Sequence, residues 1–71
     1  MNQKSVFEFG DEFICTQFSD RQPIGYSGVD ITRNGEHLGS IVDIYIPEIE
    51  DEEENIKFDN EVVTWIIDND H

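Results

Sequence analysis

The dipeptide Asn34–Gly35 is the local feature that most restricts how this chain can fold. Asn-Gly is the preferred pair for a two-residue type I′ turn, because both central positions of that turn need a positive φ. Apolar and polar residues alternate on both sides of it, in segments 29–32 and 37–46. Alternation with a period of two is typical of strands that bury one face. The sequence therefore predicts a β-hairpin centred on this turn.

The turn also predicts the register of the hairpin and the side chains on each face. The expected pairs, counted outward, are Arg33 with Glu36, Thr32 with His37, and Ile31 with Leu38. One face then carries the apolar residues Val29, Ile31, Leu38, Val42, Ile44 and Ile46. The other face carries Asp30, Thr32, His37, Asp43 and Tyr45, with Ile41 as an apolar exception.

A second hairpin is expected near the N-terminus. Segment 6–9 alternates, and segment 13–18 is rich in aromatic and β-favouring residues. A turn near 10–12 would join them, because Gly10 and Asp11 favour turns. Segment 19–25, which contains Pro23, is expected to be a loop.

The C-terminal segment permits two interpretations. Residues 62–67 form a run of strong strand formers, with apolar residues for both faces of a covered strand. A helix over 59–69, capped by Asp59, also fits, because it would place Val62, Trp65 and Ile66 on one stripe. The β-branched residues and the acidic C-terminal end count against the helix, so we favour the strand.

The expected fold is thus a single small acidic domain over residues 1–71. It is mainly β: a small antiparallel sheet or partly open barrel of about five to six strands around the Asn-Gly hairpin. The alternative is an α+β fold, in which a C-terminal helix over 59–69 packs on a four-stranded antiparallel sheet.

The net charge restricts the partners of this domain. Seventeen Asp and Glu stand against four Lys and Arg, which gives a formal net charge of −13. Nucleic acid and anionic membranes would repel such a chain, so neither is an expected direct partner. A basic protein surface is complementary in charge, and a nucleic-acid-binding protein offers one.

The acidic residues most suited to partner binding lie in one run and on the central hairpin. Residues 48–54 contain six carboxylates, and segment 48–55 is expected to be a mobile acidic loop. A strand holds same-face carboxylates in a regular row, which can imitate the phosphates of a nucleic acid. The candidate partner-binding residues are Asp30, Asp43, Glu48, Glu50, Asp51, Glu52, Glu53 and Glu54.

Catalytic chemistry is not indicated. Cys15 and His37 could only form an isolated nucleophile and base, and we expect Cys15 to be a small buried hydrophobe. No residue spacing indicates a metal or cofactor site, so we expect no catalytic residues, no cofactor and no enzyme. A lone cysteine and the lack of a long apolar segment favour a cytoplasmic location.

The sequence therefore predicts a non-enzymatic acidic binding protein that inhibits a basic, nucleic-acid-binding partner by occupying its groove as an electrostatic DNA or RNA mimic. In size and composition alone, the chain resembles small phage-encoded inhibitors of restriction or CRISPR systems, and no motif matches a particular family. The alternative is a small structural or regulatory subunit that self-associates through a sheet edge, which leaves a homo-oligomer open.

Overall fold

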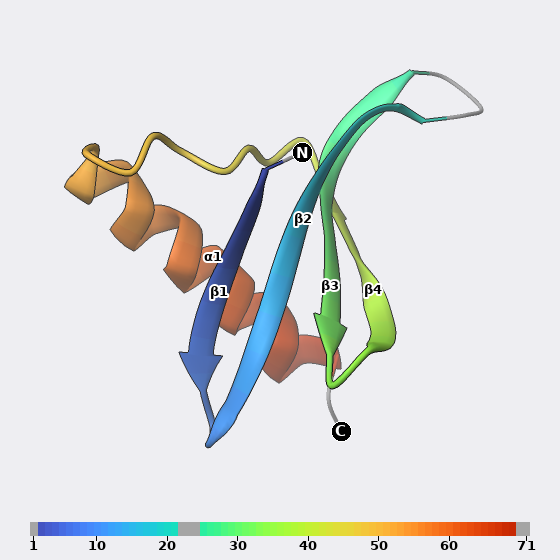
Figure 1. Cartoon of the computed structure of the whole chain (residues 1–71), viewed down its shortest axis with the longest axis vertical. Coiled ribbons are helices and arrows are strands. Elements are labelled where there is room, and N and C mark those ends of the chain that lie inside the picture. Colours follow the sequence, from blue (N-terminus) through green and yellow to red (C-terminus); the bar gives the residue numbers. More distant parts are fainter. Residues whose placement is uncertain (1, 22–24, 70–71) are drawn as a thin grey trace.

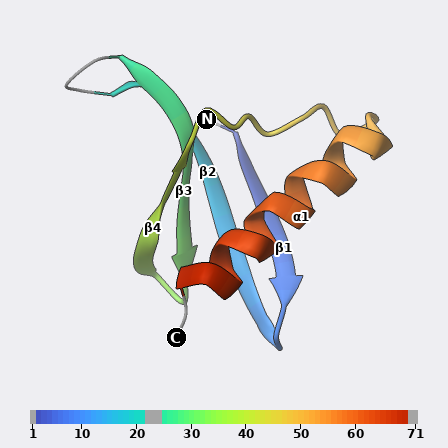
Figure 2. The same cartoon turned by 180° about the vertical axis from the view of Figure 1, so that it is seen from behind.

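The computed structural model describes residues 2–21 and 25–69. It is a two-layer α+β fold, in which one antiparallel sheet is covered on one face by a helix (Figures 1 and 2). The strands follow each other in the order β1-β2-β3-β4. The elements are β1 (Gln3–Glu8), β2 (Asp11–Arg21), β3 (Tyr26–Arg33), β4 (Glu36–Val42) and α1 (Glu52–Asn69). The described residues form four strands rather than the expected five or six, and the α+β alternative is the one confirmed.

Two tight turns connect the outer strand pairs. Asn34 and Gly35 have φ of 53° and 82°, as a type I′ turn requires, so the central hairpin is confirmed. Phe9 and Gly10 form the turn between β1 and β2, with φ of 52° and 75°, and Glu8 pairs with Asp11. This turn begins one residue earlier than expected, because Phe9 takes the left-handed position that Asn34 takes in the other hairpin.

The long central strands extend past the position where a loop was expected. Residues 19–21 belong to β2, and the ladder between β2 and β3 shifts register between Phe18 and Arg21. The remainder of the expected loop 19–25 includes residues 22–24, which lie outside the described residues.

A β-bulge in β4 changes the predicted faces of the central hairpin. Ile31 pairs with Gly39 rather than with Leu38, because the register shifts between Ile31 and Thr32. Beyond the bulge, every β4 side chain lies on the face opposite to the one expected. Ile41 therefore packs against the core, and Val42 is 51% exposed on the outer face. The predicted roles of these two residues were wrong.

The C-terminal segment is the helix α1, so the favoured strand over 62–67 was wrong. It begins at Glu52, seven residues before the helix that we considered. Phe58, Val62 and Ile66 are buried, and their spacing of four residues places them on one helical stripe. Within the described residues, no helix combines the length and the apolar character needed to cross a membrane.

The core lies between this helical stripe and one face of the sheet. Its buried members are Val6, Phe13, Cys15, Val29, Ile31, Ile44, Phe58, Val62 and Ile66. Trp65 is only half-buried and packs at the rim of this core.

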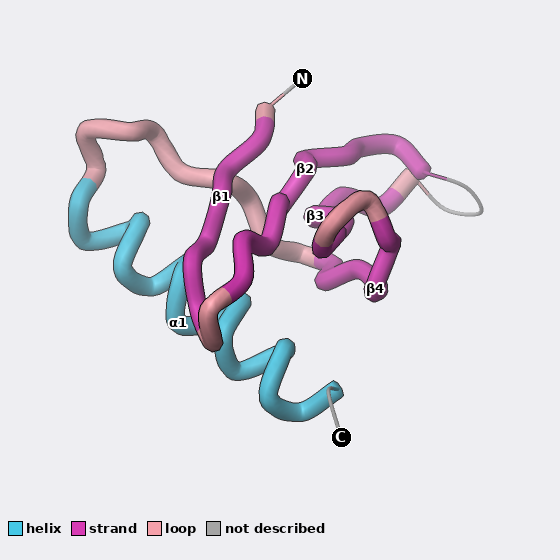
Figure 3. The backbone as a smooth tube through the Cα atoms, turned by 60° about the horizontal axis from the view of Figure 1, so that its bottom comes forward, coloured by secondary structure: helices cyan, strands magenta, loops and turns pink. Residues whose placement is uncertain are grey.

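The helix crosses the sheet obliquely. Its first turns project past the outer edge of β1, and its C-terminal end lies beneath β3 and β4 (Figures 1 to 3). A linker over 43–51 runs from the end of β4 back to the start of α1. The acidic run is therefore placed beyond the β1 edge of the sheet.

Candidate partner-binding surface

The structure divides the acidic run between the linker and the first turn of α1. Glu48, Glu50 and Asp51 lie in the linker, and Glu52, Glu53 and Glu54 begin the helix. All six side chains are exposed. All six carboxylates were expected in a loop, but three of them lie in the first turn of a helix.

The acidic residues themselves explain why the helix begins here. Asp51 is the N-cap, since its Oδ1 accepts a hydrogen bond from the backbone N–H of Glu54 at 3.2 Å. Negative side chains in the first turn also interact favourably with the helix dipole. The side-chain amide of Asn55 donates to the carbonyl oxygens of Glu48 and Asp51, at 2.8 Å each. These contacts hold the end of the linker against the helix.

Lys4 of β1 fastens this end of the helix to the sheet. Its Nζ donates to Oδ1 of Asn55 at 2.6 Å and lies 2.8 Å from Oδ1 of Asp59. The same ammonium lies 5.3 Å from the centre of the Phe58 ring. The only basic residue of β1 is thus engaged by α1.

A second set of carboxylates continues along α1. Glu54, Glu61 and Asp68 are exposed and follow each other at intervals of seven residues, which is close to two helical turns. They therefore share one side of the helix, with a rise of about 10 Å between neighbours. The sequence interpretation did not include Glu61 and Asp68 among the site residues, because this row exists only if the segment is helical.

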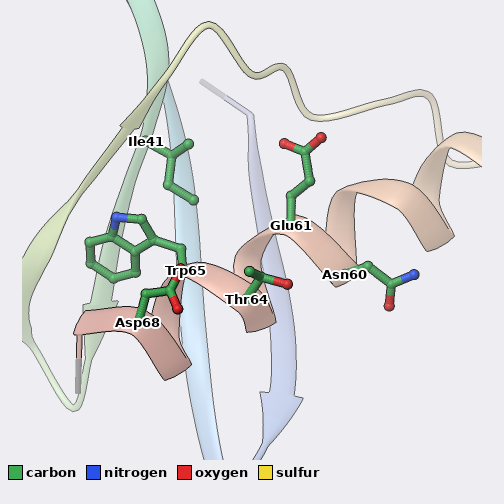
Figure 4. Close-up of a pocket in the computed structure, with 6 residues that line it drawn as sticks. All are labelled: Ile41, Asn60, Glu61, Thr64, Trp65 and Asp68. Atoms are coloured by element: carbon green, nitrogen blue, oxygen red, sulfur yellow. The ribbon is translucent and has the colours of Figure 1, made fainter. Parts of the chain in front are cut away.

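An open groove of about 390 Å³ lies between this acidic side of α1 and β4. Figure 4 shows the Trp65 indole projecting from α1 toward Ile41, with Asp68 and Glu61 on the same side of the helix. Asn60 and Thr64 complete the lining. An aromatic ring beside carboxylates suits a lysine or arginine side chain, since a cation is attracted to both.

Asp30 does not join the acidic helix. It lies on the outer face of the sheet, where its Oδ1 accepts a hydrogen bond from Oγ of Ser40 at 2.5 Å. Nε2 of His37 lies 3.5 Å from the same oxygen. The side chain of Asp30 is only 20% exposed, so this carboxylate is part of a local polar cluster rather than of the acidic run.

Asp43 is the first residue of the linker, directly after β4. It is exposed and adopts a φ of 61°, and its N–H donates to the carbonyl of Ser27 at 2.8 Å. This left-handed residue turns the chain out of β4. It is separated from the acidic helix start by the length of the linker.

Cys15 lies in the core, as expected. Its side chain is fully buried, and burial raises the pKa of the thiol to about 11. The carboxylate of Asp59 also raises this pKa, whereas Lys4 lowers it. The thiol is therefore protonated at neutral pH and is not a nucleophile there.

His37 is the exposed cross-strand partner of Thr32, as predicted, and the two lie beside the hairpin turn. In the described part of the chain, no group of three His, Cys, Asp or Glu side chains is arranged to hold a metal ion.

Comparison with protein families, curated proteins and solved structures finds no match for this chain. The candidate surface therefore rests on its own geometry and charge.

Proposed function

We propose that this protein is a non-enzymatic acidic binding protein that occupies the nucleic-acid-binding groove of a basic partner. The observation that carries the proposal is the row of carboxylates on α1 and its cap. Residues 51–69 contain seven carboxylates and one lysine. A helix of 18 residues is about 27 Å long, and one DNA strand places about eight phosphates along that distance.

The contacts of these carboxylates support the proposal. Asp59 is engaged by Lys4, and Glu54 lies 3.6 Å from Lys57 in an exposed pair that is worth little in water. Glu52, Glu53 and Glu61 are exposed, and no described basic group lies within ion-pair distance of them. They are free to meet cations of a partner.

The Trp65 groove adds a second support. Its carboxylates and indole suit an arginine or lysine side chain, and basic grooves that bind nucleic acid are rich in both residues. A partner that inserts one such side chain would bury aromatic surface as well as neutralise charge.

The test compares two triple variants with the same net charge. One carries Glu52→Gln, Glu53→Gln and Glu61→Gln on the helix, and the other carries Glu8→Gln, Glu12→Gln and Glu36→Gln on the sheet. A partner is isolated on the immobilised wild-type protein and its affinity is measured for all three proteins. We expect the helix variant to bind more weakly than the sheet variant, and we expect duplex DNA to displace the partner. Equal affinities, or a partner that DNA does not displace, would refute the proposal.

The second candidate is a small structural or regulatory subunit that associates with a copy of itself. The unpaired outer edge of β1 favours it, because an edge strand can pair with a strand of another chain. It predicts a dimer in solution and binding that is insensitive to DNA, both of which light scattering and the same displacement assay would reveal.

A further inference from the structure

The outer edge of β1 offers backbone groups that no described strand pairs. β1 is the first strand of the sheet and pairs only with β2. In a hairpin closed by Glu8 and Asp11, the even-numbered residues of β1 bond toward β2. The bond from the N–H of Gln17 to the carbonyl of Asn2 follows this pattern. The N–H and C=O groups of Gln3, Ser5 and Phe7 therefore point away from the sheet, along about 14 Å of edge.

The N-terminal part of α1 covers one side of this edge. The first turns of the helix project past β1, as Figures 1 and 3 show. Glu52, Ile56, Asp59 and Val63 are spaced as i, i+4, i+7 and i+11, so they share one flank of the helix. Asp59 reaches Lys4 of β1, whereas Trp65 on the other flank packs on Gly39 of β4. The first flank is thus the one on the β1 side.

This flank is partly apolar and has little of the sheet to cover. Ile56 is 57% exposed, and Val63 is half-buried. Glu52 is exposed between the apolar positions and the acidic linker. A further strand beside β1 would lie under Ile56 and would meet Glu52, the carboxylate of this flank that Lys4 does not engage.

A second cavity opens at the start of the same edge. Its volume is about 510 Å³, and its walls come from the first residues of β1, the linker and Asn55. Ile46, Pro47 and Ile49 supply apolar surface there, and Ile49 is 92% exposed. A strand that continued beyond Gln3 would enter this cavity.

The other edge of the sheet is less suited to strand addition. β4 contains the bulge at Leu38 and Gly39, and a bulge twists an edge away from regular pairing. β1 pairs with β2 in an unbroken register over its whole length. Of the two edge strands, β1 is therefore the one better suited to regular pairing.

The charge selects the occupant. A second copy would bring together two chains that each carry a net charge of −13, and like charges across an interface are costly. An extended segment rich in Lys or Arg would instead complement the acidic flank and linker.

We infer that the β1 edge binds an extended basic segment of the partner protein as a fifth strand of the sheet. The flank of α1 that carries Ile56 would cover one side of this strand. This inference rests on the proposed function, because it names how the basic partner is held. Main-chain hydrogen bonds to Gln3, Ser5 and Phe7 give affinity, and Glu52 together with the acidic linker favours a basic segment.

The test uses a peptide of about nine residues in which Lys and Val alternate, long enough to span the edge. Its controls are the same peptide with alternate amides N-methylated and a Glu-Val peptide. Binding is followed by NMR on the full chain, with hydrogen exchange of the Ser5 and Phe7 amides as the site-specific readout. We expect the Lys-Val peptide to protect both amides, and neither control peptide to do so. Binding without this protection, or no binding, would overturn the inference.

A matched pair of variants isolates the edge hydrogen bond. Ser5→Pro removes the outward N–H, and Ser5→Ala removes only the hydroxyl that donates to Glu12. Ser5→Pro should lower the affinity for the Lys-Val peptide about tenfold, whereas Ser5→Ala should leave that affinity unchanged. Phe7→Pro and Phe7→Ala repeat the comparison if Ser5→Pro does not fold. Equal affinities within the pair, or a wild-type dimer with Ser5 already protected, would exclude the basic strand.

These variants also separate the two proposals, since none of them changes the charge of the protein. If charge neutralisation on α1 weakens binding of the partner and Ser5→Pro does not, the electrostatic function is supported and the β1-edge site is refuted. If Ser5→Pro weakens the partner but DNA does not displace it, the edge site stands without nucleic-acid mimicry.

Discussion

The indole of Trp65 lies directly against the Cα of Gly39. A Cβ added at Gly39 would lie 2.6 Å from Cζ2 and 2.8 Å from Cη2 of the ring. A glycine at this point of β4 therefore lets the C-terminal half of α1 approach the sheet. The same ring lines the groove that contains Glu61 and Asp68.

Gly39→Ala should consequently destabilise the protein by about 1–3 kcal/mol, because the ring must move or the strand must shift. The free energy of unfolding in urea measures the loss, and the fluorescence of Trp65, the only tryptophan, reports the displacement of the ring. A double-mutant cycle supplies the control. In a Trp65→Leu background, the same substitution should cost less, and additive effects would show that the two residues are not in contact.

Phe9→Asn should stabilise the protein by about 1 kcal/mol. Phe9 holds a φ of 52° although it is 62% exposed, so it carries backbone strain with little burial in return. The substitution gives the turn between β1 and β2 the same Asn-Gly sequence as the turn between β3 and β4. Thermal unfolding measures the gain, and Phe7→Asn, at a strand position two residues before Phe9, is the control that should not stabilise. A lower melting temperature for Phe9→Asn would mean that the Phe9 ring makes a contact worth more than the strain.

Asp51→Ala should cost about 1 kcal/mol of stability, because the N–H of Glu54 loses its capping acceptor. Asp51→Asn removes the same charge but keeps an oxygen that can cap. The free energy of unfolding and the helical circular dichroism signal should fall for the first variant and stay close to wild type for the second. Equal losses in both would assign the effect to charge rather than to capping.

Stability should fall as the pH rises from about 9 to about 11, because of Cys15. Burial raises the pKa of this thiol from 9.0 to about 11, so over that interval the folded thiol keeps its proton while the unfolded thiol loses it. The unfolded state then binds fewer protons, and the free energy of unfolding decreases with pH. Below pH 9 both states are protonated, and the thiol has no effect.

Cys15→Ala isolates this contribution from those of tyrosine and lysine. The difference in unfolding free energy between wild type and variant should narrow between pH 8 and pH 10.5. A constant difference would mean that folding does not raise the pKa of the Cys15 thiol. At pH 8 the native thiol should also react far more slowly with a thiol reagent than the unfolded thiol does.

The sequence predicts the central hairpin well because one dipeptide determines its geometry. Asn34 and Gly35 both accept positive φ, and the pairs next to the turn follow from it. The bulge two residues further on has no comparable local signal. It places Gly39 opposite Ile31, where the Trp65 ring packs on the glycine, and this ring belongs to an element far along the chain.

The C-terminal helix was predicted only as the alternative, and with a start seven residues too late, because different parts of this segment suggest different structures. Residues 62–67 are strand formers, and 48–54 look like a solvated loop when considered alone. The helix depends on both segments, since Asp51 caps its N-terminus and Val62 packs into the core. Tertiary packing decides here against local propensity.

The candidate site could be predicted only in part, for the same reason. The acidic run is visible as composition, and its members are exposed as expected. Asp30 lies instead on the outer face of the sheet. Glu61 and Asp68 join the surface only through a helical period, and the edge of β1 becomes a candidate only once the strand order is known.

The hydrogen bond between Lys4 and Asn55 joins residues 51 positions apart, so it cannot form until α1 has been synthesised. The four strands form by neighbouring hairpins, so the sheet can arise while the chain is still being synthesised. Its apolar face has no cover until Phe58, Val62 and Ile66 have been made. A ribosome-bound chain that ends before α1 should therefore expose Phe13, Val29 and Ile31 to solvent and need chaperone protection, and release of the 18 residues of α1 should complete folding in one step.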